Sequence, residues 1–297
     1  MNCYLPESMQ RLPPGYSRAE LEAALREGHI LTARAVCCDE RHALTVALGC
    51  CEGKIPREEA AEGITDGSAR DIAILRCVGH PVCAKVTACL PDGTVLLSRR
   101  LAQREAMDRL LQGARPGDIL PAVVTNCASF GAFCDVGCGA AALLGTAQTG
   151  ISRIRHAAER FTDGQRIFAA IRAIDAPRRR IFLTQKELLG TWAENAAGFR
   201  AGQTVTGVVR SLTDYGAFIE LTPNLSGLAE NDGTLHVGDA VAVYIRAIVP
   251  ESLKIKLSVL HRVEPQPRRP LCYFRTSGHL DQWRYGSEQF AKCYTIF

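Results

Sequence analysis

Phe130-Gly131-Ala132-Phe133 recurs 85 positions later as Tyr215-Gly216-Ala217-Phe218. Val123-Val124 precedes the first copy and Val208-Val209 precedes the second, so the repeat extends beyond the four-residue motif. A long stretch that recurs at a fixed offset indicates a duplicated structural unit. The sequence therefore predicts that one small domain occurs twice in this region.

The spacing of glycines and apolar residues extends the repeat into a common frame. The second and third units share the positions Gly117, Leu120, Ala122 and Val124, and Gly202, Val205, Gly207 and Val209. Each unit closes with a β-type run, at 180–184 and 254–258, and 28–99 fits the same frame loosely. Three units of about 70 to 85 residues, each with about five short strands, predict small all-β barrels joined by short helices.

Helix signals and breaks in the pattern divide the chain further. Ser17-Arg18-Ala19-Glu20 is a capping-box pattern that predicts a helix start, and 101–111 and 186–198 read as connectors. Three prolines follow Val263, and seven of the nineteen aromatic residues lie in 273–297, which we expect to fold back on the third unit as a structural contact or, alternatively, to offer a base-stacking surface. The predicted divisions are an N-terminal helix segment (1–27), a degenerate barrel (28–112), two RNA-binding barrels (113–190 and 191–263) and a Pro-rich linker with an aromatic tail (264–297).

Charge is concentrated rather than general. The 297-residue chain is 47% hydrophobic and 22% charged with a net charge of +4, which fits packed domains and excludes a disordered tail. Residues 150–186 hold nine Lys or Arg against three acids, so this stretch carries +6 and the rest of the chain −2. A local cluster of this sign is expected of a surface that binds a phosphate backbone, although a solvated face is the common alternative.

The cysteines and the first residues bear on location. The chain has thirteen cysteines but neither a secretory start nor an apolar run long enough to span a membrane, so we expect a cytoplasmic protein with reduced thiols. Cys127, Cys134 and Cys138 have a spacing that a metal could use, but zinc sites show two such pairs in sequence. We therefore expect buried thiols, no metal and no cofactor, and we find no catalytic grouping.

The aromatic motifs indicate a binding surface. In a regular strand, positions i and i+3 point to opposite faces, but the glycine in each motif permits a bend that restores a shared face. We expect Phe130 and Phe133 to form a stacking surface outside the barrel beside Arg178-Arg179-Arg180. Flat rings beside guanidinium groups suit single-stranded nucleic acid, whose bases stack while its phosphates are neutralised. The alternative is that one ring of each motif fills the barrel core.

These residues resemble the S-one RNA-binding domain family, named after the largest protein of the bacterial small ribosomal subunit. The shared order is Gly-x-Val, aromatic-Gly-Ala-Phe and a closing strand such as Arg180-Ile181-Phe182-Leu183-Thr184. The likeness is close over 117–260 and loose over 28–100. It implies a mainly β chain of three tandem five-stranded oligonucleotide-binding (OB) barrels joined by short helices, with an aromatic-rich C-terminal tail.

The resemblance also implies which side chains contact RNA: both aromatics of each motif and an acidic and a basic residue near the closing hairpin. The predicted residues are Phe130, Phe133, Asp175, Arg178, Arg179 and Arg180 in the second unit, and Tyr215, Phe218, Lys254 and Lys256 in the third. The family's histidine falls near Gly150 and Glu230, and its hairpin aspartate near Val249, so we expect the third unit to bind more weakly. The first unit has Asp39-Glu40-Arg41-His42 in place of the motif, which favours a scaffold or protein-contact role.

The sequence thus predicts a cytoplasmic, non-enzymatic protein that binds single-stranded RNA, with mRNA in translation on or near the small ribosomal subunit as the implied setting. It predicts no membrane partner and leaves the oligomeric state open. The alternative is a protein-interaction scaffold that docks to the ribosome or to another RNA-containing complex. An accessory domain set of a nuclease is a third alternative, which the lack of an acidic metal-ligand cluster disfavours.

Overall fold

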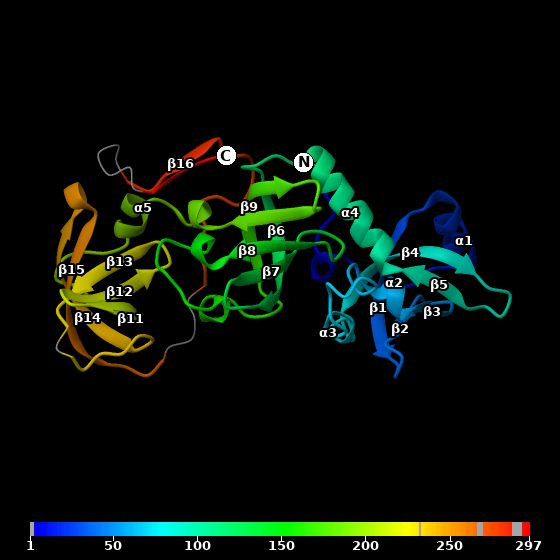
Figure 1. Cartoon of the computed structure of the whole chain (residues 1–297), viewed down its shortest axis with the longest axis horizontal. Helices are drawn as coiled ribbons and strands as arrows, with labels where there is room; N and C mark the ends of the chain where they lie inside the picture. The colour runs from blue at the N-terminus through cyan, green and yellow to red at the C-terminus, as the bar shows by residue number, and fades with distance from the viewer. Residues whose placement is uncertain (1–2, 232, 266–269, 287–292) are drawn as a thin grey trace.

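Three closed five-stranded barrels make up most of the chain. The computed structural model describes residues 3–231, 233–265, 270–286 and 293–297. In each barrel the first three strands follow in order, and the fifth strand lies between the third and the fourth. The barrels succeed one another along the long axis of the molecule, with helix α4 (Arg99–Gly113) between the first and the second (Figure 1). The predicted fold class, mainly β with three tandem OB-type barrels, is confirmed.

The first barrel begins after the predicted N-terminal helix. The Ser17 hydroxyl accepts a hydrogen bond from the Glu20 amide and the Glu20 carboxylate accepts from the Ser17 amide, so the capping box is confirmed. The elements up to α4 are η1 (Glu7–Met9), α1 (Arg18–Glu27), β1 (Ile30–Cys38), β2 (Leu44–Ala47), β3 (Glu52–Ile55), α2 (Arg57–Ala60), α3 (Ile72–Leu75), β4 (Pro81–Cys89) and β5 (Val95–Ser98).

The second and third barrels have the same strand order with different loops. The second contains β6 (Ile119–Cys127), β7 (Gly131–Asp135), β8 (Ala141–Gly145), η2 (Thr146–Gln148), η3 (Ala157–Glu159), β9 (Arg166–Asp175) and β10 (Arg180–Thr184). After η4 (Lys186–Leu189) and α5 (Trp192–Ala196), the third contains β11 (Thr204–Thr213), β12 (Gly216–Thr222), β13 (Leu225–Ala229), β14 (Ala240–Val249), η5 (Pro250–Ser252) and β15 (Lys254–Arg262).

The strand registers are superimposable among the three barrels. Each first strand has an irregularity at the same place, between Ala35 and Cys37, Val124 and Asn126, and Val209 and Ser211. Each fourth strand has another where it pairs with the fifth. Bulges of this kind bend a strand, which is how a short sheet closes into a barrel. Residues at the same register position can therefore be compared directly.

Alternation along the second strand decides which residues enter each core. Leu44 and Val46, Ala132 and Cys134, and Ala217 and Ile219 are fully buried in their respective barrels. Side chains alternate with period two, so the residue between each buried pair points outward. Thr45, Phe133 and Phe218 occupy these three outward positions.

The C-terminal tail forms a strap, which we define as residues 270–286 and 293–297. It includes the paired strands β16 (Gln282–Arg284) and β17 (Tyr294–Ile296) and runs beside α5 and the second barrel (Figure 1). Leu280 is buried with Ile119, Ala170 and Leu188 of the second barrel and its connector. The expectation that the tail folds back on the third barrel is therefore only partly right, because the strap packs mainly on the second; Phe290 lies outside the described residues.

Candidate nucleic-acid interface

Both aromatic motifs place their two rings together on the outside of a barrel. The rings of Phe130 and Phe133 meet edge to face with centroids 5.9 Å apart, and those of Tyr215 and Phe218 do so at 6.1 Å. Phe130 is 57% exposed and Tyr215 71% exposed, while the second ring of each pair is half-buried. The alternative in which one ring fills the core is thereby excluded for these residues.

The glycine inside each motif is required by the neighbouring strand. A Cβ at Gly131 would lie 2.5 Å from the Leu144 carbonyl oxygen, and one at Gly216 would lie 2.4 Å from that of Ala229. Gly216 also has a φ of +149°, which other residues rarely adopt. The backbone can therefore bend tightly against the next strand and bring both rings to the same outer face.

The half-buried ring of each pair belongs to a row of outward side chains that crosses the sheet. Phe133 pairs with Leu143 of β8, which pairs with Phe182 of β10. In the third barrel Phe218 pairs with Leu228, which pairs with Lys256. We call these two surfaces, each comprising a motif ring pair and its row, the ring surfaces. Neighbouring strands are about 4.8 Å apart, so each row is about 10 Å wide, enough to lie under more than one base.

The Arg178-Arg179-Arg180 hairpin lies across β8 from the rings rather than directly beside them. Arg180 is two residues before Phe182, at the end of β10 farther from Phe130. Arg178 is exposed and pairs with Asp175 at 3.2 Å. Arg179 turns toward α4, where it pairs with Asp108 and donates to the Arg104 carbonyl oxygen at 3.2 Å. Of the three arginines, Arg179 therefore contributes to the contact between α4 and the second barrel.

Lys254 and Lys256 have the same relation to the third barrel that Arg180 and Phe182 have to the second. Lys254 follows Arg180 by 74 positions, and Lys256 follows Phe182 by the same number. Both lysines are exposed. Val249 pairs with Lys254 where Asp175 pairs with Arg180, so the third hairpin lacks the acidic neighbour. The sequence comparison predicted this difference.

Two further arginines at the ring surfaces were not predicted as site residues. Arg172 and Arg246 each lie in the bulge of the fourth strand, next to the strand that carries Phe182 or Lys256. Arg172 donates to Gln148 Oε1 at 3.0 Å, and Arg246 donates to Glu230 Oε1 at 3.4 Å. They are also 74 positions apart, and this second offset is the signal that could have found them.

The first barrel has no ring at the equivalent place. In the second barrel the paired outward residues are, in order across the sheet, Asn126, Phe133, Leu143 and Phe182. The residues at the same positions of the first barrel are Cys37, Thr45, Lys54 and Leu96. Thr45 thus replaces the phenylalanine. This barrel lacks the flat apolar face that base stacking needs.

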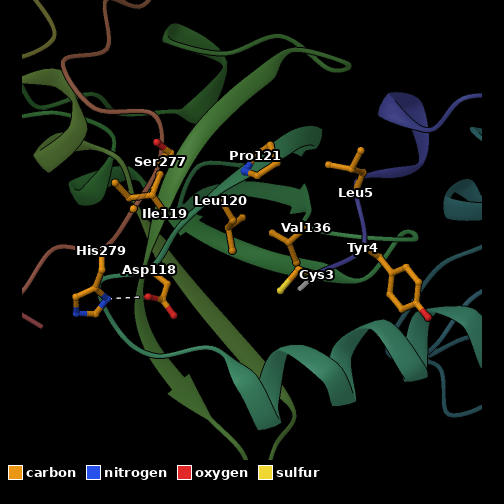
Figure 2. A pocket seen from close by; sticks show the side chains of 11 residues that line it. Cys3, Tyr4, Leu5, Asp118, Ile119, Leu120, Pro121, Val136, Ser277 and His279 are labelled. Atoms are coloured by element: carbon orange, nitrogen blue, oxygen red, sulfur yellow. Dashed lines mark hydrogen bonds and ion pairs between the residues drawn. The ribbon is translucent and has the colours of Figure 1, made fainter. Parts of the chain in front are cut away.

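A cavity of about 480 Å³ lies apart from the ring surfaces, between the N-terminal segment, β6 and the strap (Figure 2). His279 Nδ1 is 2.7 Å from Asp118 Oδ1 at its edge. Burial opposes ionisation of Asp118, but hydrogen bonds from the Arg115 amide and His279 lower its pKa below the usual value. The His279–Asp118 pair thus links the strap to the second barrel at the edge of the cavity.

Within the described ranges, no group of three or more His, Cys, Asp or Glu side chains could hold a metal ion. Cys134 and Cys138 are buried, and burial raises the pKa of Cys134. No helix in the described part of the chain is long and apolar enough to cross a membrane.

Comparison with known proteins identifies relatives of this chain. Small ribosomal subunit protein bS1 of Staphylococcus aureus (strain COL) is 31% identical over 198 residues, which cover 61% of this chain and 50% of the relative. The chain is homologous to bacterial ribosomal protein bS1. The bS1 proteins of Rhizobium meliloti and Rhodopseudomonas palustris are 30% and 32% identical, over 60% and 56% of this chain and 31% and 32% of their own lengths. The resemblance seen in the motifs is confirmed.

The match with bS1 is partial. The chain spans about half the length of the Staphylococcus aureus bS1 proteins and about a third of the other two. No family model matches the chain. A solved multidomain protein with nucleic acid binding domains from Streptococcus pneumoniae is 12% identical, covering 83% of this chain and 77% of its own, with a TM-score of 0.27.

Proposed function

We propose that this chain binds single-stranded RNA on the ring surfaces of its second and third barrels. Bases stack on the exposed rings, and arginine and lysine side chains neutralise the phosphates. The setting is mRNA binding in translation, on or near the small ribosomal subunit in the cytoplasm, without a catalytic step. Homology to a protein of the small ribosomal subunit supports this setting.

The observation that carries the proposal is the exposure of two aromatic ring pairs at the same register position in two barrels. An exposed phenylalanine or tyrosine ring costs free energy in water, and the presence of one in both copies favours a binding role. Basic side chains lie in or beside both rows: Arg172, Arg178 and Arg180 in one barrel, and Arg246, Lys254 and Lys256 in the other. Rings with adjacent cations are the surface that single-stranded nucleic acids use.

Removing the rings tests the stacking half of the proposal. A labelled oligouridine of about 12 nucleotides, followed by fluorescence anisotropy, should bind the Phe130→Ala/Phe133→Ala variant roughly 10- to 100-fold more weakly than the wild type. The loss is smaller than two independent stacks because the two rings contact each other. The Tyr215→Ala/Phe218→Ala variant should lose less, since Val249 replaces Asp175 in the closing hairpin of the third barrel.

Tyr294→Ala is a matched control. Tyr294 lies in β17 of the strap and is 57% exposed, as Phe130 is, but it belongs to neither ring surface. Its replacement should leave the affinity unchanged. Wild-type affinity in both ring-pair variants would refute stacking at these sites, and a loss confined to Tyr294→Ala would place the base-binding surface on the strap.

Salt dependence tests the electrostatic half. If the two barrels together contact about six phosphates, the slope of log affinity against log salt should be roughly −4, and a slope near zero would exclude phosphate neutralisation. RNA incubated with the protein and magnesium should remain intact, and cleavage would contradict a non-enzymatic role. Retention of the oligouridine at micromolar concentrations separates RNA binding from a purely scaffolding function.

A protein-contact role is a second candidate for the first barrel alone. Helix α3 lies beside β1 (Figure 1). Both carry exposed apolar side chains, namely Val36, Ile72 and Leu75. Exposed apolar residues of this kind are typical of docking sites. An Ile72→Asp/Leu75→Asp variant should retain RNA affinity but sediment less with small ribosomal subunits; unchanged sedimentation would refute this role.

A further inference from the structure

We propose that the loop of residues 149–160 joins the two ring surfaces into one path, and that Arg153 and Arg155 hold the backbone of a single RNA strand between them. The inference rests on the proposed RNA binding and adds how the two barrels share one strand.

The loop begins and ends beside the first ring pair. The Thr146 amide, just before the loop, donates to the Phe130 carbonyl oxygen at 3.1 Å. The Ala157 amide donates to the Ala128 carbonyl oxygen, also at 3.1 Å. Both ends of the loop are thus fixed to the segment that carries Phe130.

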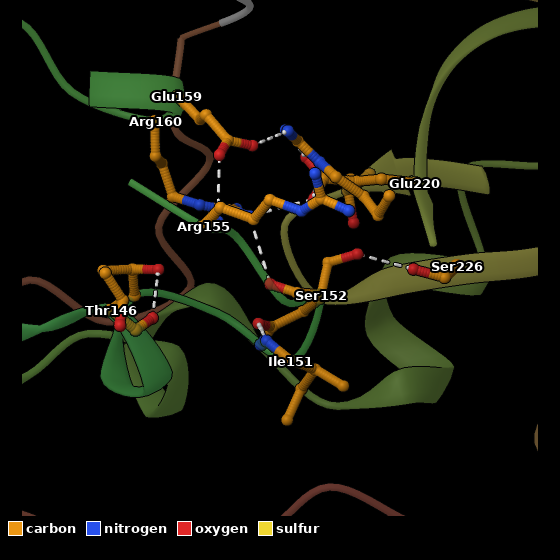
Figure 3. Close-up of polar contacts among 12 residues, drawn as sticks. Thr146, Ile151, Ser152, Arg155, Glu159, Arg160, Glu220 and Ser226 are labelled. Carbon is orange, nitrogen blue, oxygen red and sulfur yellow. Dashed lines mark hydrogen bonds and ion pairs between the residues drawn. The ribbon is translucent and has the colours of Figure 1, made fainter. Parts of the chain in front are cut away.

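The middle of the loop rests on the third barrel. Ser152 Oγ and Ser226 Oγ are 2.6 Å apart, and the Ser152 amide donates to the Pro223 carbonyl oxygen at 3.0 Å. The Ile151 amide donates to Asn224 Oδ1 at 3.1 Å. Figure 3 shows Ser152 and Ser226 facing each other across this junction. The loop is therefore held by both barrels.

The contact on the third barrel adjoins its ring surface. Ser226 pairs with Glu220 across β12 and β13, and two residues along the same strands Leu228 pairs with Phe218. Two residues of a strand span roughly 7 Å on the same face. The loop consequently forms one border of the second ring surface while its ends adjoin the first.

Ion pairs at the junction leave only some of its arginines available to a ligand. Arg160 Nη2 is 2.9 Å from Glu220 Oε2 (Figure 3). Arg210 Nη1 is 2.7 Å from Glu159 Oε2. Arg160 and Arg210 are thus neutralised within the protein. Arg153 and Arg155 are exposed, and among the described residues neither guanidinium forms a hydrogen bond or ion pair.

These two positive side chains lie on a fixed loop between two aromatic surfaces. An anionic partner satisfies their charge, and the rings on either side favour one that also carries flat bases. Since the hydrogen bonds already hold the loop, ordering it on binding has little entropic cost. A single-stranded RNA meets all three requirements, whereas an acidic peptide meets only the first.

The test compares Arg153→Gln/Arg155→Gln with a control of equal charge change, Arg26→Gln/Arg41→Gln, on the first barrel. Each variant is titrated with oligouridines of about 4 and about 16 nucleotides at several salt concentrations, since a single OB barrel covers about 4 to 16 nucleotides. For the long RNA, the loop variant should weaken binding and make the salt slope shallower by roughly 1.4, or about 0.7 for each lost phosphate contact. The short RNA should bind the wild type and the loop variant equally, and the control should match the wild type with both.

Several results would overturn the inference. If the loop variant has the same salt slope as the control on the long RNA, Arg153 and Arg155 do not contact the strand. If it loses affinity equally for both RNA lengths, the two arginines belong to one ring surface and do not connect the two. Competition by polyglutamate as strong as that by oligouridine would indicate an acidic peptide as the ligand. If instead the ring-pair variants bind RNA like the wild type, the proposed function itself fails. Unchanged thermal unfolding of the loop variant confirms that it is folded.

Discussion

Glu220→Gln should open the junction between the second and third barrels. The Glu220 carboxylate accepts from Arg160 Nη2 at 2.9 Å, from Arg210 Nε at 3.0 Å and from Arg210 Nη2 at 3.1 Å. The side chains of Arg160 and Glu220 are 3% and 11% exposed. Burial lowers the pKa of Arg160, although Glu220 opposes this effect. Glutamine keeps the shape of the side chain but removes the charge that two arginines share.

The magnitude follows from the loss of one partner of a buried ion pair, which costs about 3 to 5 kcal/mol because the other charge stays buried and uncompensated. Arg160 has few other partners: it donates to the Ser152 carbonyl oxygen at 3.4 Å, and its Nε and Nη1 have no hydrogen-bond partner among the described residues. If the two barrels separate, water hydrates Arg160. The free energy lost on replacing Glu220 therefore cannot exceed the free energy that holds the two barrels together. With a denaturant dependence of about 2 kcal/mol per molar urea, the transition should move down by roughly 1.5 to 2.5 M.

Urea unfolding followed by tryptophan fluorescence measures this shift. The chain has two tryptophans, Trp192 of α5 and Trp283 of the strap, and both are buried. The Trp192 amide donates to the strap at the Tyr285 carbonyl oxygen, at 2.9 Å, and its ring packs in the core of the third barrel. Fluorescence should therefore report the junction before far-ultraviolet circular dichroism reports loss of the barrels. Glu251→Gln is the control, because Glu251 is an exposed residue of the same barrel. A fluorescence midpoint equal to that of the control would refute the assignment of the junction to this ion-pair network.

Three other changes have defined outcomes. Gly216→Ala should lower the free energy of unfolding by about 1 to 3 kcal/mol, because its Cβ would lie 2.4 Å from the Ala229 carbonyl oxygen, and an unchanged urea midpoint would contradict the tight approach. Asp108→Asn should cost less than about 1 kcal/mol, since its pair with Arg179 is exposed; a larger loss of thermal stability would show that this contact holds α4 in place. Burial and the Glu7 carboxylate raise the pKa of Asp135 to about 7, so the folded protein retains a proton that the unfolded chain releases near pH 4. The stability from this proton is fully present below about pH 4, falls as the pH rises, and is lost as the pH passes about 7. Asp135→Asn should flatten that fall in a series of urea midpoints, and curves parallel to the wild type would disprove the raised pKa.

The barrels and the outward rings were predictable because they depend on local sequence. Alternating apolar residues and glycine turns define the strands, and the glycine of Phe130-Gly131-Ala132-Phe133 allows its rings to share a face. The helix that follows Ser17 was predictable for the same reason, since a capping box is a contact within one turn.

Other parts of the candidate site depend on which strands are neighbours. The 74-residue offset marks Arg172 and Arg246 as equivalent positions, but it does not place either side chain at a ring surface. Arg172 and Arg246 reach the ring surfaces only because a bulge in the fourth strand sets their register. Arg179 belongs to a basic run in the sequence, yet α4 lies close enough to pair with it. The aromatic content of the tail indicated burial but could not specify which of two adjacent barrels supplies the covering surface.

The strap has a consequence for the order in which the molecule assembles. Leu280 completes an apolar cluster with Ile119 of the second barrel, but it follows the third barrel in the chain. During synthesis the surface of the second barrel around Ile119 therefore stays uncovered until the third barrel and the strap have been translated. Packing of the strap is then a late step that requires both of these barrels, so a chain truncated before residue 270 would contain the three barrels without the strap.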